Sequence, residues 1–269
     1  MEKYLKLLAP VLRIAEQAAV AISDIYHKEY SIIKKIDHSP LTDADLASHQ
    51  IIEEGLLALT PELPLISEEG TEPPFDERQQ WQSYWLVDPL DGTREFINKT
   101  DEFVINIALI NNNKPVLGVI HVPVTGVVYY AVQGYGAFKK NKGKEPEKIR
   151  SKVWDGGKIR IVASSRASNI HYQNLKKCLN DSETIIMGAA LKSCLVAEGA
   201  ADLYVRYGET SEWDTAAAQI IVDESGGALM ALDGLPLQYN RTSSLLNESF
   251  IVVGDRHHDW LSLIPCDKI

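Results

Sequence analysis

Cysteine is scarce in this sequence: only Cys178, Cys194 and Cys266 are present, and they are widely spaced. No two of them form a Cys-x-x-Cys pair, and an odd number argues against a framework of disulfides. We therefore expect free thiols in a protein of the reducing cytoplasm.

Long hydrophobic runs are missing as well. The first residues (MEKYLKLLAPVLRIAEQ) carry charged side chains through their apolar stretch, so they lack the hydrophobic region of a signal peptide. No uninterrupted apolar stretch approaches the ~20 residues that span a membrane as a helix. The sequence therefore predicts a protein without an integral membrane span.

Basic residues are outnumbered by acidic ones. Lys and Arg total 27 against 37 Asp and Glu, which gives a formal net charge of −10. Such a chain repels polyphosphate backbones, so nucleic acid is not an expected partner. A small anionic substrate remains compatible with this charge if cations mediate the contact. The 269 residues, 45% of them hydrophobic, can bury a sizeable core as one large domain or two closely joined ones.

The first half of the chain predicts two helices followed by a meander of strands. Apolar residues recur at three- and four-residue intervals over residues 3–28, and a second helix is predicted from Thr42 to about Leu59. Strand-like runs then follow one another without helices between them, which favours a largely antiparallel, α+β arrangement. These runs are residues 63–67, 84–87, 104–110, 116–122, 127–132 and 137–139.

A polar, glycine-rich segment at residues 140–158 is the predicted boundary between two parts of the chain. Beyond it, strands alternate with helices, which is typical of an α/β layer. The predicted strands are 159–163, 184–187, 202–206 and 250–253, and the predicted helices are 168–179, 190–198 and 213–224. We therefore expect an α+β subdomain at residues 1–150 and an α/β subdomain at residues 151–269.

The most informative segment is residues 85–93 (WLVDPLDGT). An apolar strand runs into Asp88, a rigid turn with proline, a second acid at Asp91, and Gly92, which lets the backbone approach a ligand. Such a turn brings two carboxylates together with the Leu90 carbonyl between them, an all-oxygen set that suits Mg²⁺. Asp, Pro and Gly are also ordinary surface-turn residues. The complete string after a buried strand favours the metal site.

Further acidic residues stand at the ends of predicted elements. Glu68 and Glu69 follow a short strand, where a solvated acidic loop is the alternative explanation. Asp45 and Asp214 each lie three residues after a Thr or Ser, so helix capping alone would explain them. No G-x-S-x-G, P-loop or H-E-x-x-H motif occurs, which disfavours a serine hydrolase, a P-loop NTPase and a zinc protease.

Together these segments resemble the inositol monophosphatase superfamily. Residues 88–93 (DPLDGT) resemble its D-P-[IL]-D-G-T signature, and residues 213–218 (WDTAAA) resemble its W-D-x-A signature. The T-x-x-D segment at 42–45 and the Glu68-Glu69 pair stand in the family's order. Residues 188–204 look most like the CysQ subfamily, the bacterial 3′(2′),5′-bisphosphate nucleotidases.

The resemblance implies an inositol-monophosphatase-like αβαβα sandwich and a phosphatase that uses two or three Mg²⁺ ions. The implied metal ligands are Glu68, Asp88, the Leu90 carbonyl, Asp91 and Asp214. The implied catalytic residues are Glu68, Thr93 and Asp45. Thr93 would hydrogen-bond the attacking water, and Asp45 would orient it. Asp43, where many relatives carry a small residue, adds a charge near this site.

For the substrate, the resemblance implies 3′-phosphoadenosine 5′-phosphate, hydrolysed to AMP and phosphate in sulfate assimilation and nucleotide recycling, with 3′-phosphoadenylyl sulfate as a second substrate. The implied substrate contacts are Gly92, Thr93, Lys192, Arg166, Glu212 and Asp214. Lys192 and Arg166 would lie near the second phosphate, with a surface position as the alternative for each. Glu212 would contact the sugar.

Two alternative functions remain at this point. One is hydrolysis of inositol or sugar monophosphates by the same machinery. The other is a metal or nucleotide sensor that keeps the fold without turnover. The resemblance also implies inhibition by Li⁺ and either a monomer or a homodimer. The expected location is the cytoplasm, with peripheral attachment to the cytoplasmic face of the inner membrane described for some relatives.

Overall fold

The computed structural model describes most of the chain, namely residues 1–34, 40–165, 170–179 and 181–264. Its helices are α1 (Glu2–Tyr26), α2 (Asp43–Leu59), α3 (Phe75–Arg78), α4 (Thr93–Ile97), α5 (Ile170–Cys178), α6 (Leu191–Ala197) and α7 (Ala216–Ser225), with 3₁₀ turns η1 (Glu212–Asp214) and η2 (Leu261–Leu263). Among these described helices, none is both long and apolar enough to cross a membrane.

The strands form two main sheets. The larger has the order β3-β4-β5-β6-β7-β8-β9, with β3 (Leu65–Ser67), β4 (Ser83–Asp91), β5 (Val104–Asn111), β6 (Lys114–Val122), β7 (Val127–Val132), β8 (Gly136–Lys140) and β9 (Glu147–Lys148). Its first pair, β3 with β4, is parallel, and the pairs from β4 to β9 are antiparallel. The prediction of a largely antiparallel first sheet is confirmed.

The second sheet has the order β11-β10-β12-β16-β14 and mixes parallel with antiparallel pairs. Its strands are β10 (Ile159–Ala163), β11 (Ser182–Ile186), β12 (Leu203–Arg206), β14 (Ala228–Ala231) and β16 (Phe250–Val253). Two short ladders complete the pairing, β1 (Ile32–Lys34) with β2 (Pro40–Thr42) and β13 (Thr210–Ser211) with β15 (Leu246–Asn247).

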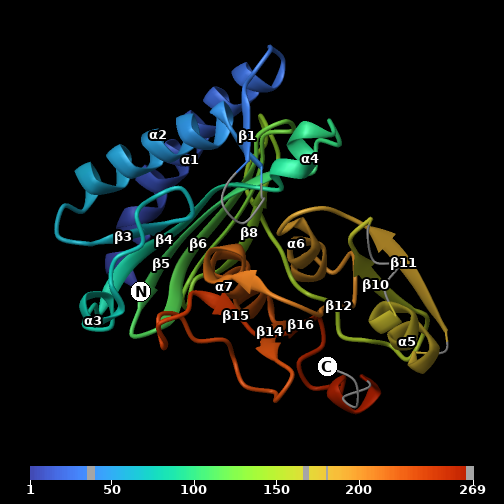
Figure 1. Cartoon of the computed structure of the whole chain (residues 1–269). Helices are drawn as coiled ribbons and strands as arrows, with labels where there is room; N and C mark the ends of the chain where they lie inside the picture. Colours follow the sequence, from blue (N-terminus) through green and yellow to red (C-terminus); the bar gives the residue numbers. More distant parts are fainter. Residues whose placement is uncertain (35–39, 166–169, 180, 265–269) are drawn as a thin grey trace.

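These elements stack in five layers (Figure 1). Helices α1 and α2 cover one face of the larger sheet, and α6 and α7 lie between the two sheets. Helix α5 packs through Leu175 on the outer face of the second sheet, where Ile161 and Leu203 also point. The predicted αβαβα sandwich is therefore confirmed.

The residue pattern of β5 explains why the larger sheet carries helices on both faces. Ile105, Ile107 and Leu109 belong to the cluster that α1 and α2 cover. Ala108 and Ile110 alternate with them and belong to the cluster around α7. Because side chains of a strand point alternately to opposite faces, the continuous apolar run needs two helical layers to bury it.

One predicted helix differs from the structure. The segment expected as a single helix over 213–224 is the 3₁₀ turn η1 followed by α7, and Thr215 separates them with φ −118° and ψ −27°. The turn is closed by a capping box between Ser211 and Asp214. The S-x-x-D spacing therefore predicts the cap correctly, but this cap belongs to a 3₁₀ turn and not to the helix that follows it.

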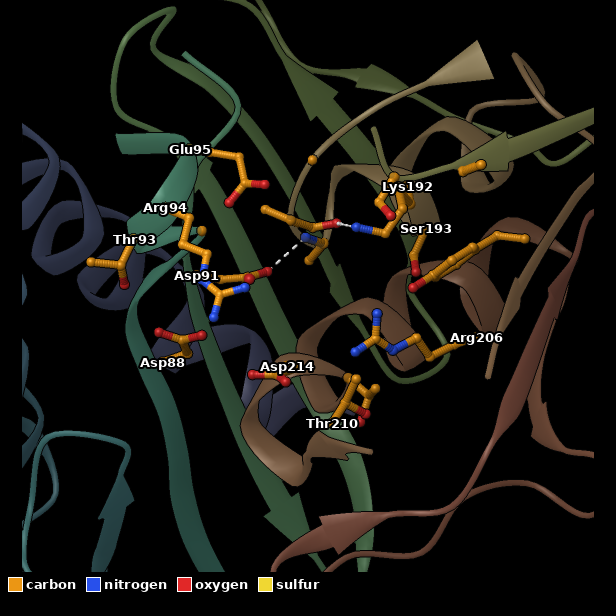
Figure 2. A pocket seen from close by; sticks show the side chains of 18 of the residues that line it. Asp88, Asp91, Thr93, Arg94, Glu95, Lys192, Ser193, Arg206, Thr210 and Asp214 are labelled. Atoms are coloured by element: carbon orange, nitrogen blue, oxygen red, sulfur yellow. Dashed lines mark hydrogen bonds between the residues drawn. The ribbon is translucent and has the colours of Figure 1, made fainter. Parts of the chain in front are cut away.

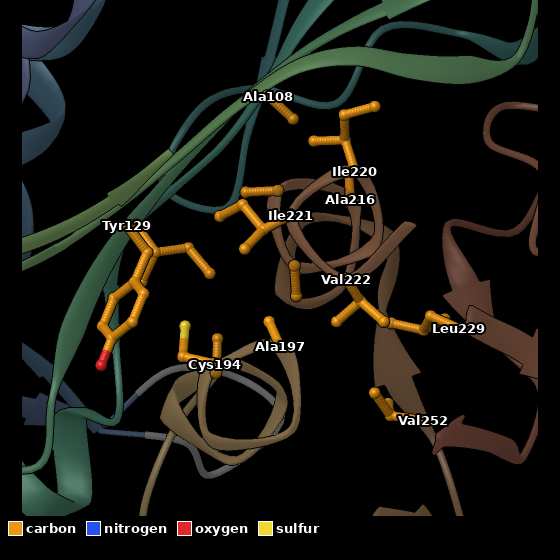
Figure 3. Close-up of a cluster of buried hydrophobic side chains, with 14 of the residues drawn as sticks. Ala108, Tyr129, Cys194, Ala197, Ala216, Ile220, Ile221, Val222, Leu229 and Val252 are labelled. Atoms are coloured by element: carbon orange, nitrogen blue, oxygen red, sulfur yellow. The ribbon is translucent and has the colours of Figure 1, made fainter. Parts of the chain in front are cut away.

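Helix α7 packs against both sheets, so the hydrophobic core continues across the division predicted at residue 150 (Figure 3). Figure 3 shows Ile220 beside Ala108 of the larger sheet and, on another side of the helix, Val222 toward Leu229 and Val252 of the second sheet. One buried cluster thus includes residues from both halves of the chain. Strand β9 also lies inside the predicted linker and pairs with β8. The division at residue 150 stays a prediction.

Gly118 of β6 sets how closely α7 approaches the larger sheet. A Cβ at this position would lie 2.5 Å from Ile220 Cγ2 and 2.7 Å from the Ala217 carbonyl oxygen. Because backbone stands in the way, the helix itself would have to shift to accept even a methyl group.

Replacing Gly118 by alanine should lower the free energy of unfolding by about 1–3 kcal/mol, because the methyl group overlaps α7. A thermal melt measures this loss as a lower Tm. Gly157→Ala is the control, since a Cβ there meets only the exposed Asp155 carboxylate, at 3.0 Å. Equal Tm values for the two variants would contradict the close contact between Gly118 and α7.

Candidate active site

Strand β4 carries two candidate metal ligands into the middle of the molecule. The strand is buried along most of its length, and its pairing with β5 shifts register between Asp88 and Asp91. In this irregular turn the Leu90 N–H donates to Asp88 Oδ1 at 2.9 Å, and Ser48 Oγ donates to the Pro89 carbonyl at 2.7 Å. Both carboxylates therefore project from a turn that hydrogen bonds hold rigidly.

Asp91 also joins the two halves of the chain. Its Oδ2 accepts from the Ala190 N–H at 2.6 Å and from Asn106 Nδ2 at 3.4 Å. The segment before Ala190 packs tightly on the first half, since a Cβ on Gly188 would lie 2.8 Å from the Glu102 carbonyl oxygen. A residue of the predicted metal site is thus a structural link as well.

Thr93 and Asp45 form a hydrogen-bonded pair beside these acids. Asp45 Oδ2 accepts from the Thr42 N–H at 2.7 Å and from Thr42 Oγ1 at 2.6 Å, which confirms the predicted capping of α2. Its other oxygen, Oδ1, accepts from Thr93 Oγ1 at 3.1 Å. Asp45 is only 1% exposed, so its contact with the cavity runs through Thr93.

Asp214 reaches the same place from the second half of the chain. It ends η1, where its Oδ2 accepts from the Ser211 N–H at 2.9 Å. Figure 2 shows its carboxylate facing those of Asp88 and Asp91 across a hollow. Strand β4 and η1 are also direct neighbours in the fold.

The hollow is a cavity of about 570 Å³, within the range of small-molecule sites. Its walls include most of the residues predicted from the sequence, namely Glu68, Asp88, Leu90, Asp91, Gly92, Thr93, Lys192 and Asp214. Gly92 has φ +96°, a conformation that glycine adopts without strain. Arg166 lies outside the described residues. Asp43 accepts a hydrogen bond from the Ser31 N–H.

Glu212 lies elsewhere than expected for a sugar contact. Its side chain is 4% exposed and is absent from the cavity wall in the described part of the chain. Both carboxylate oxygens accept from the Asn240 N–H, at 2.8 and 2.9 Å. Burial raises its pKa to about 7. The geometry gives Glu212 a role in holding the chain around Asp214.

The carboxylates of the cavity raise one another's pKa values, because each negative charge disfavours ionisation of its neighbours. Burial raises the pKa of Asp88, and the neighbouring Glu68, Asp91 and Asp214 raise it further. Burial, then the charge of Asp91, raises the pKa of Asp214 to about 8. The pKa of Asp91 is raised by burial too, although Lys192 opposes that shift. Without a further cation the site carries more negative charge than its surroundings compensate.

The donors fit Mg²⁺ in type and charge. They are hard carboxylate oxygens and a carbonyl, and each aspartate already has one oxygen fixed by a backbone N–H. Among the described residues, no three His, Cys, Asp or Glu side chains stand close enough to form a ready-made metal cluster. A divalent cation bound between these carboxylates would offset the repulsion that raises their pKa values.

Two cations line the opposite wall. Lys192 of α6 is 8% exposed, and its Nζ donates to the Ala189 carbonyl at 2.6 Å. Arg206, at the end of β12, points into the hollow (Figure 2), and its Nε is buried without a hydrogen-bond partner among the described residues. Burial lowers the pKa of Lys192, and the charge of Arg206 lowers it further. The same charge partly offsets the rise in the pKa of Asp214. Arg206 is not among the site residues predicted from the sequence, although it is a cation at the end of a predicted strand, where functional side chains often stand.

The family model that matches this chain is that of the inositol monophosphatase family, over residues 7–261. The chain belongs to the inositol monophosphatase family. A curated relative, the 3′(2′),5′-bisphosphate nucleotidase CysQ of Haemophilus influenzae, is 41% identical over 258 residues, which make up 96% of this chain and 96% of the relative. The superfamily inferred from the two sequence signatures is therefore confirmed.

Solved structures of the family share the fold. The crystal structure of CysQ from Bacteroides thetaiotaomicron is 37% identical, with a TM-score of 0.80 over 92% of this chain and 97% of that one. An IMPase/NADP phosphatase complexed with Mg²⁺ and phosphate is 21% identical, with a TM-score of 0.79 over 99% and 97% of the two chains. At that identity the likeness shows the fold alone. Members of the family typically use Mg²⁺.

Thermal stabilisation by Mg²⁺ should grow as the pH rises from about 6 to about 8. The raised pKa of Asp214, about 8, means that folding favours its protonated form, so its contribution to stability is lost as the pH rises toward that value. A divalent cation held by this carboxylate would favour its ionised form and so offset the loss. Tm with Mg²⁺ and with chelator, measured at both pH values, checks this.

Asp214→Asn is the control, because it removes the titrating group and should flatten the pH dependence of the Tm gain. The asparagine side chain keeps an oxygen that can accept from the Ser211 N–H. An equal Tm gain at both pH values in the unaltered protein would contradict the electrostatic account of the family's acidic site.

Proposed function

We propose that this protein is a magnesium-dependent phosphatase that hydrolyses the 3′-phosphate of 3′-phosphoadenosine 5′-phosphate and leaves AMP and phosphate. The observation that carries the proposal is one cavity in which the buried Asp88 and the half-buried Asp91 and Asp214 face two cations, Lys192 and Arg206. The aspartates suit metal ions at the scissile phosphate, and the cations suit a second phosphate. The CysQ relatives bear the name of this activity.

The proposed metal ligands are Glu68, Asp88, the Leu90 carbonyl, Asp91 and Asp214. Two or three Mg²⁺ ions bound there would activate water, offset the charge of the phosphate and stabilise the leaving oxygen. Asp88 would be a ligand common to more than one of these ions, and the charges of Glu68, Asp91 and Asp214, the other acids of the proposed set, all act on it. Inhibition by Li⁺ at one of these positions stays a prediction.

Thr93 is the proposed contact of the attacking water. Its hydroxyl donates to Asp45 Oδ1, so its oxygen keeps lone pairs that can accept a hydrogen bond from water. Asp45 thereby fixes the orientation of the hydroxyl, which is the positioning role proposed for it. Gly92 precedes Thr93 and has no side chain that would keep a ligand away from the backbone. The N–H groups of Gly92 and Thr93 are therefore the proposed donors to phosphate oxygens.

The second phosphate is proposed to bind between Lys192 and Arg206. Their charges repel one another on the same wall of the cavity, and an anion between them would relieve that repulsion. Tyr172 and Tyr204 line the same cavity and are the proposed aromatic neighbours of an adenine ring. Arg166 stays a candidate for the same phosphate, and no contact supports Glu212 as a sugar ligand. 3′-Phosphoadenylyl sulfate carries the same 3′-phosphate and is the proposed second substrate.

The test of substrate class is phosphate release from 3′-phosphoadenosine 5′-phosphate and from inositol 1-phosphate, each with Mg²⁺ and with chelator. We expect a strong preference for the nucleotide and loss of release on chelation. Equal or reversed preference would transfer the function to inositol or sugar monophosphates. Release that continues in chelator would rule out the metal mechanism.

Asp91→Asn is the control that separates an enzyme from a sensor. The variant keeps an oxygen that can accept from the Ala190 N–H, so the link between the halves can persist. Hydrolysis should fall roughly a thousandfold, because a metal ion contributes several kcal/mol to the transition state. Nucleotide binding by the unaltered protein with Mg²⁺ but without phosphate release would favour the sensor.

Arg206→Gln should reduce kcat/KM for 3′-phosphoadenosine 5′-phosphate by roughly tenfold to a hundredfold, since a charge-assisted hydrogen bond is worth ~1.5–3 kcal/mol. The same variant should leave kcat/KM for 3′-AMP nearly unchanged, because that substrate has the same scissile bond and lacks the second phosphate. Steady-state kinetics on both substrates decide this. An equal loss on both would place Arg206 elsewhere in the reaction.

A further inference from the structure

Arg78, at the end of α3, is a fully buried cation that lies outside the cavity. Its side chain is 0% exposed. Nη1 donates to Asn240 Oδ1 at 2.5 Å and to the Thr242 carbonyl at 3.0 Å, and Nη2 donates to the Ser243 carbonyl at 2.6 Å. The remaining ionic contact, Nη2 to Glu72 Oε1 at 3.2 Å, involves a largely exposed carboxylate. Arg78 is therefore directed mainly at the chain around residue 240.

Asn240 connects Arg78 with Glu212, which lies two residues before Asp214. Its backbone N–H donates to both oxygens of Glu212, at 2.8 and 2.9 Å, and its side-chain amide donates to the Arg78 carbonyl. Asn240 is 3% exposed and has φ +57°, a left-handed backbone conformation that asparagine adopts more readily than most residues. Arg78, Asn240 and Glu212 thus form one buried chain of hydrogen bonds.

The chain of bonds ends on the turn that carries Asp214. Glu212 is the first residue of η1, and its N–H donates to the Leu245 carbonyl at 2.8 Å. Asn247 Nδ2 donates to the Ser211 carbonyl at 2.7 Å from the same outer segment. The segment 240–247 therefore holds the turn through hydrogen bonds to Ser211 and Glu212, and Arg78 in turn binds that segment.

The other end of the network leads to the remaining acids. Arg78 lies a few residues before β4, the strand that presents Asp88 and Asp91. The first residue of η1 is therefore tied to the start of β4 through contacts that bypass the cavity. Arg78 is therefore one of the links that join the turn of Asp214 to the strand of the other two acids, beside the direct packing of η1 on β4.

We propose that Arg78, through Asn240 and Glu212, is a positioning residue that fixes Asp214 relative to Asp88 and Asp91 and so sets metal affinity. This inference rests on the metal site of the proposed function. Residues that orient metal ligands from outside typically change metal affinity 10–100-fold when they are replaced. A buried cation is also an unfavourable means of gaining stability alone, because removing it from water is costly. Its Nε has no hydrogen-bond partner among the described residues, which adds to that cost.

The test is the Kd for Mn²⁺, a probe for the Mg²⁺ site, measured by electron paramagnetic resonance on the full chain without substrate. In Arg78→Lys the charge remains, but one ammonium cannot span the acceptors that the guanidinium reaches. We expect the Kd for Mn²⁺ to rise by about 10–100-fold. In kinetics, the Mg²⁺ concentration for half-maximal rate should rise, and the KM at saturating Mg²⁺ should stay near that of the unaltered protein.

Arg160→Lys is the matched control. Arg160 also spans a carboxylate and two carbonyls, since it donates to Asp202, Gly199 and Ala200. That cluster has no described hydrogen bond to the cavity acids. We expect a comparable loss of Tm in the control and an unchanged Kd for Mn²⁺.

Asn240→Gly provides a second variant in case Arg78→Lys does not fold. Glycine tolerates φ +57° and keeps the N–H that Glu212 accepts, but it removes the side-chain bonds to Arg78. Folded Arg78→Lys or Asn240→Gly that binds Mn²⁺ as tightly as the unaltered protein would overturn the inference. So would an equal loss of affinity in Arg160→Lys. Failure of the unaltered protein to bind Mn²⁺ would instead contradict the proposed function, and the inference would fall with it.

Discussion

The structure depends on one electrostatic constraint: several carboxylates are buried together where the two halves of the chain meet. Burial penalises each charge, and the others add repulsion, so the pKa values of Asp88, Asp91 and Asp214 are all raised. Each of these aspartates accepts one backbone N–H, and the donors are Leu90, Ala190 and Ser211. These donors come from an irregular strand, a loop before a helix and the last residue of β13, which caps a 3₁₀ turn. Different local structures therefore meet the same electrostatic need.

The parts of the site that sequence predicted are those that local chemistry determines. The turn after Val87 and the caps at Asp45 and Asp214 each involve residues within three or four positions of one another, so their spacing is visible in the sequence. The helix predicted over 213–224 was wrong at its start because a 3₁₀ turn accepts the same S-x-x-D cap. Motif spacing identified the acids more reliably than the elements that carry them.

The parts that sequence missed depend on partners far along the chain. Arg78 and Asn240 are 162 residues apart, and Arg78 lies among acidic residues in a four-residue helix, where a solvated charge is the ordinary expectation. Glu212 lies beside a metal-ligand motif, so proximity in sequence suggested a ligand contact, whereas burial directs it to Asn240. Arg206 could have been predicted from the sequence. It stands two residues after Tyr204 on the predicted strand, so the two side chains point to the same side, and both line the cavity.

The two halves of the chain contribute different chemistry to the cavity. The first half supplies all the candidate metal ligands except Asp214, and the second supplies Lys192, Arg206 and much of the aromatic wall. Substitutions on α6 and β12 can therefore change which phosphate ester is bound while the acids remain in place. The connections between the halves, from Asp91 to Ala190 and from Arg78 to the 240–247 segment, limit that freedom because they join the two halves that form the cavity. Within a shared fold, substrate choice is then open to change at the cavity surface and restricted at these two connections.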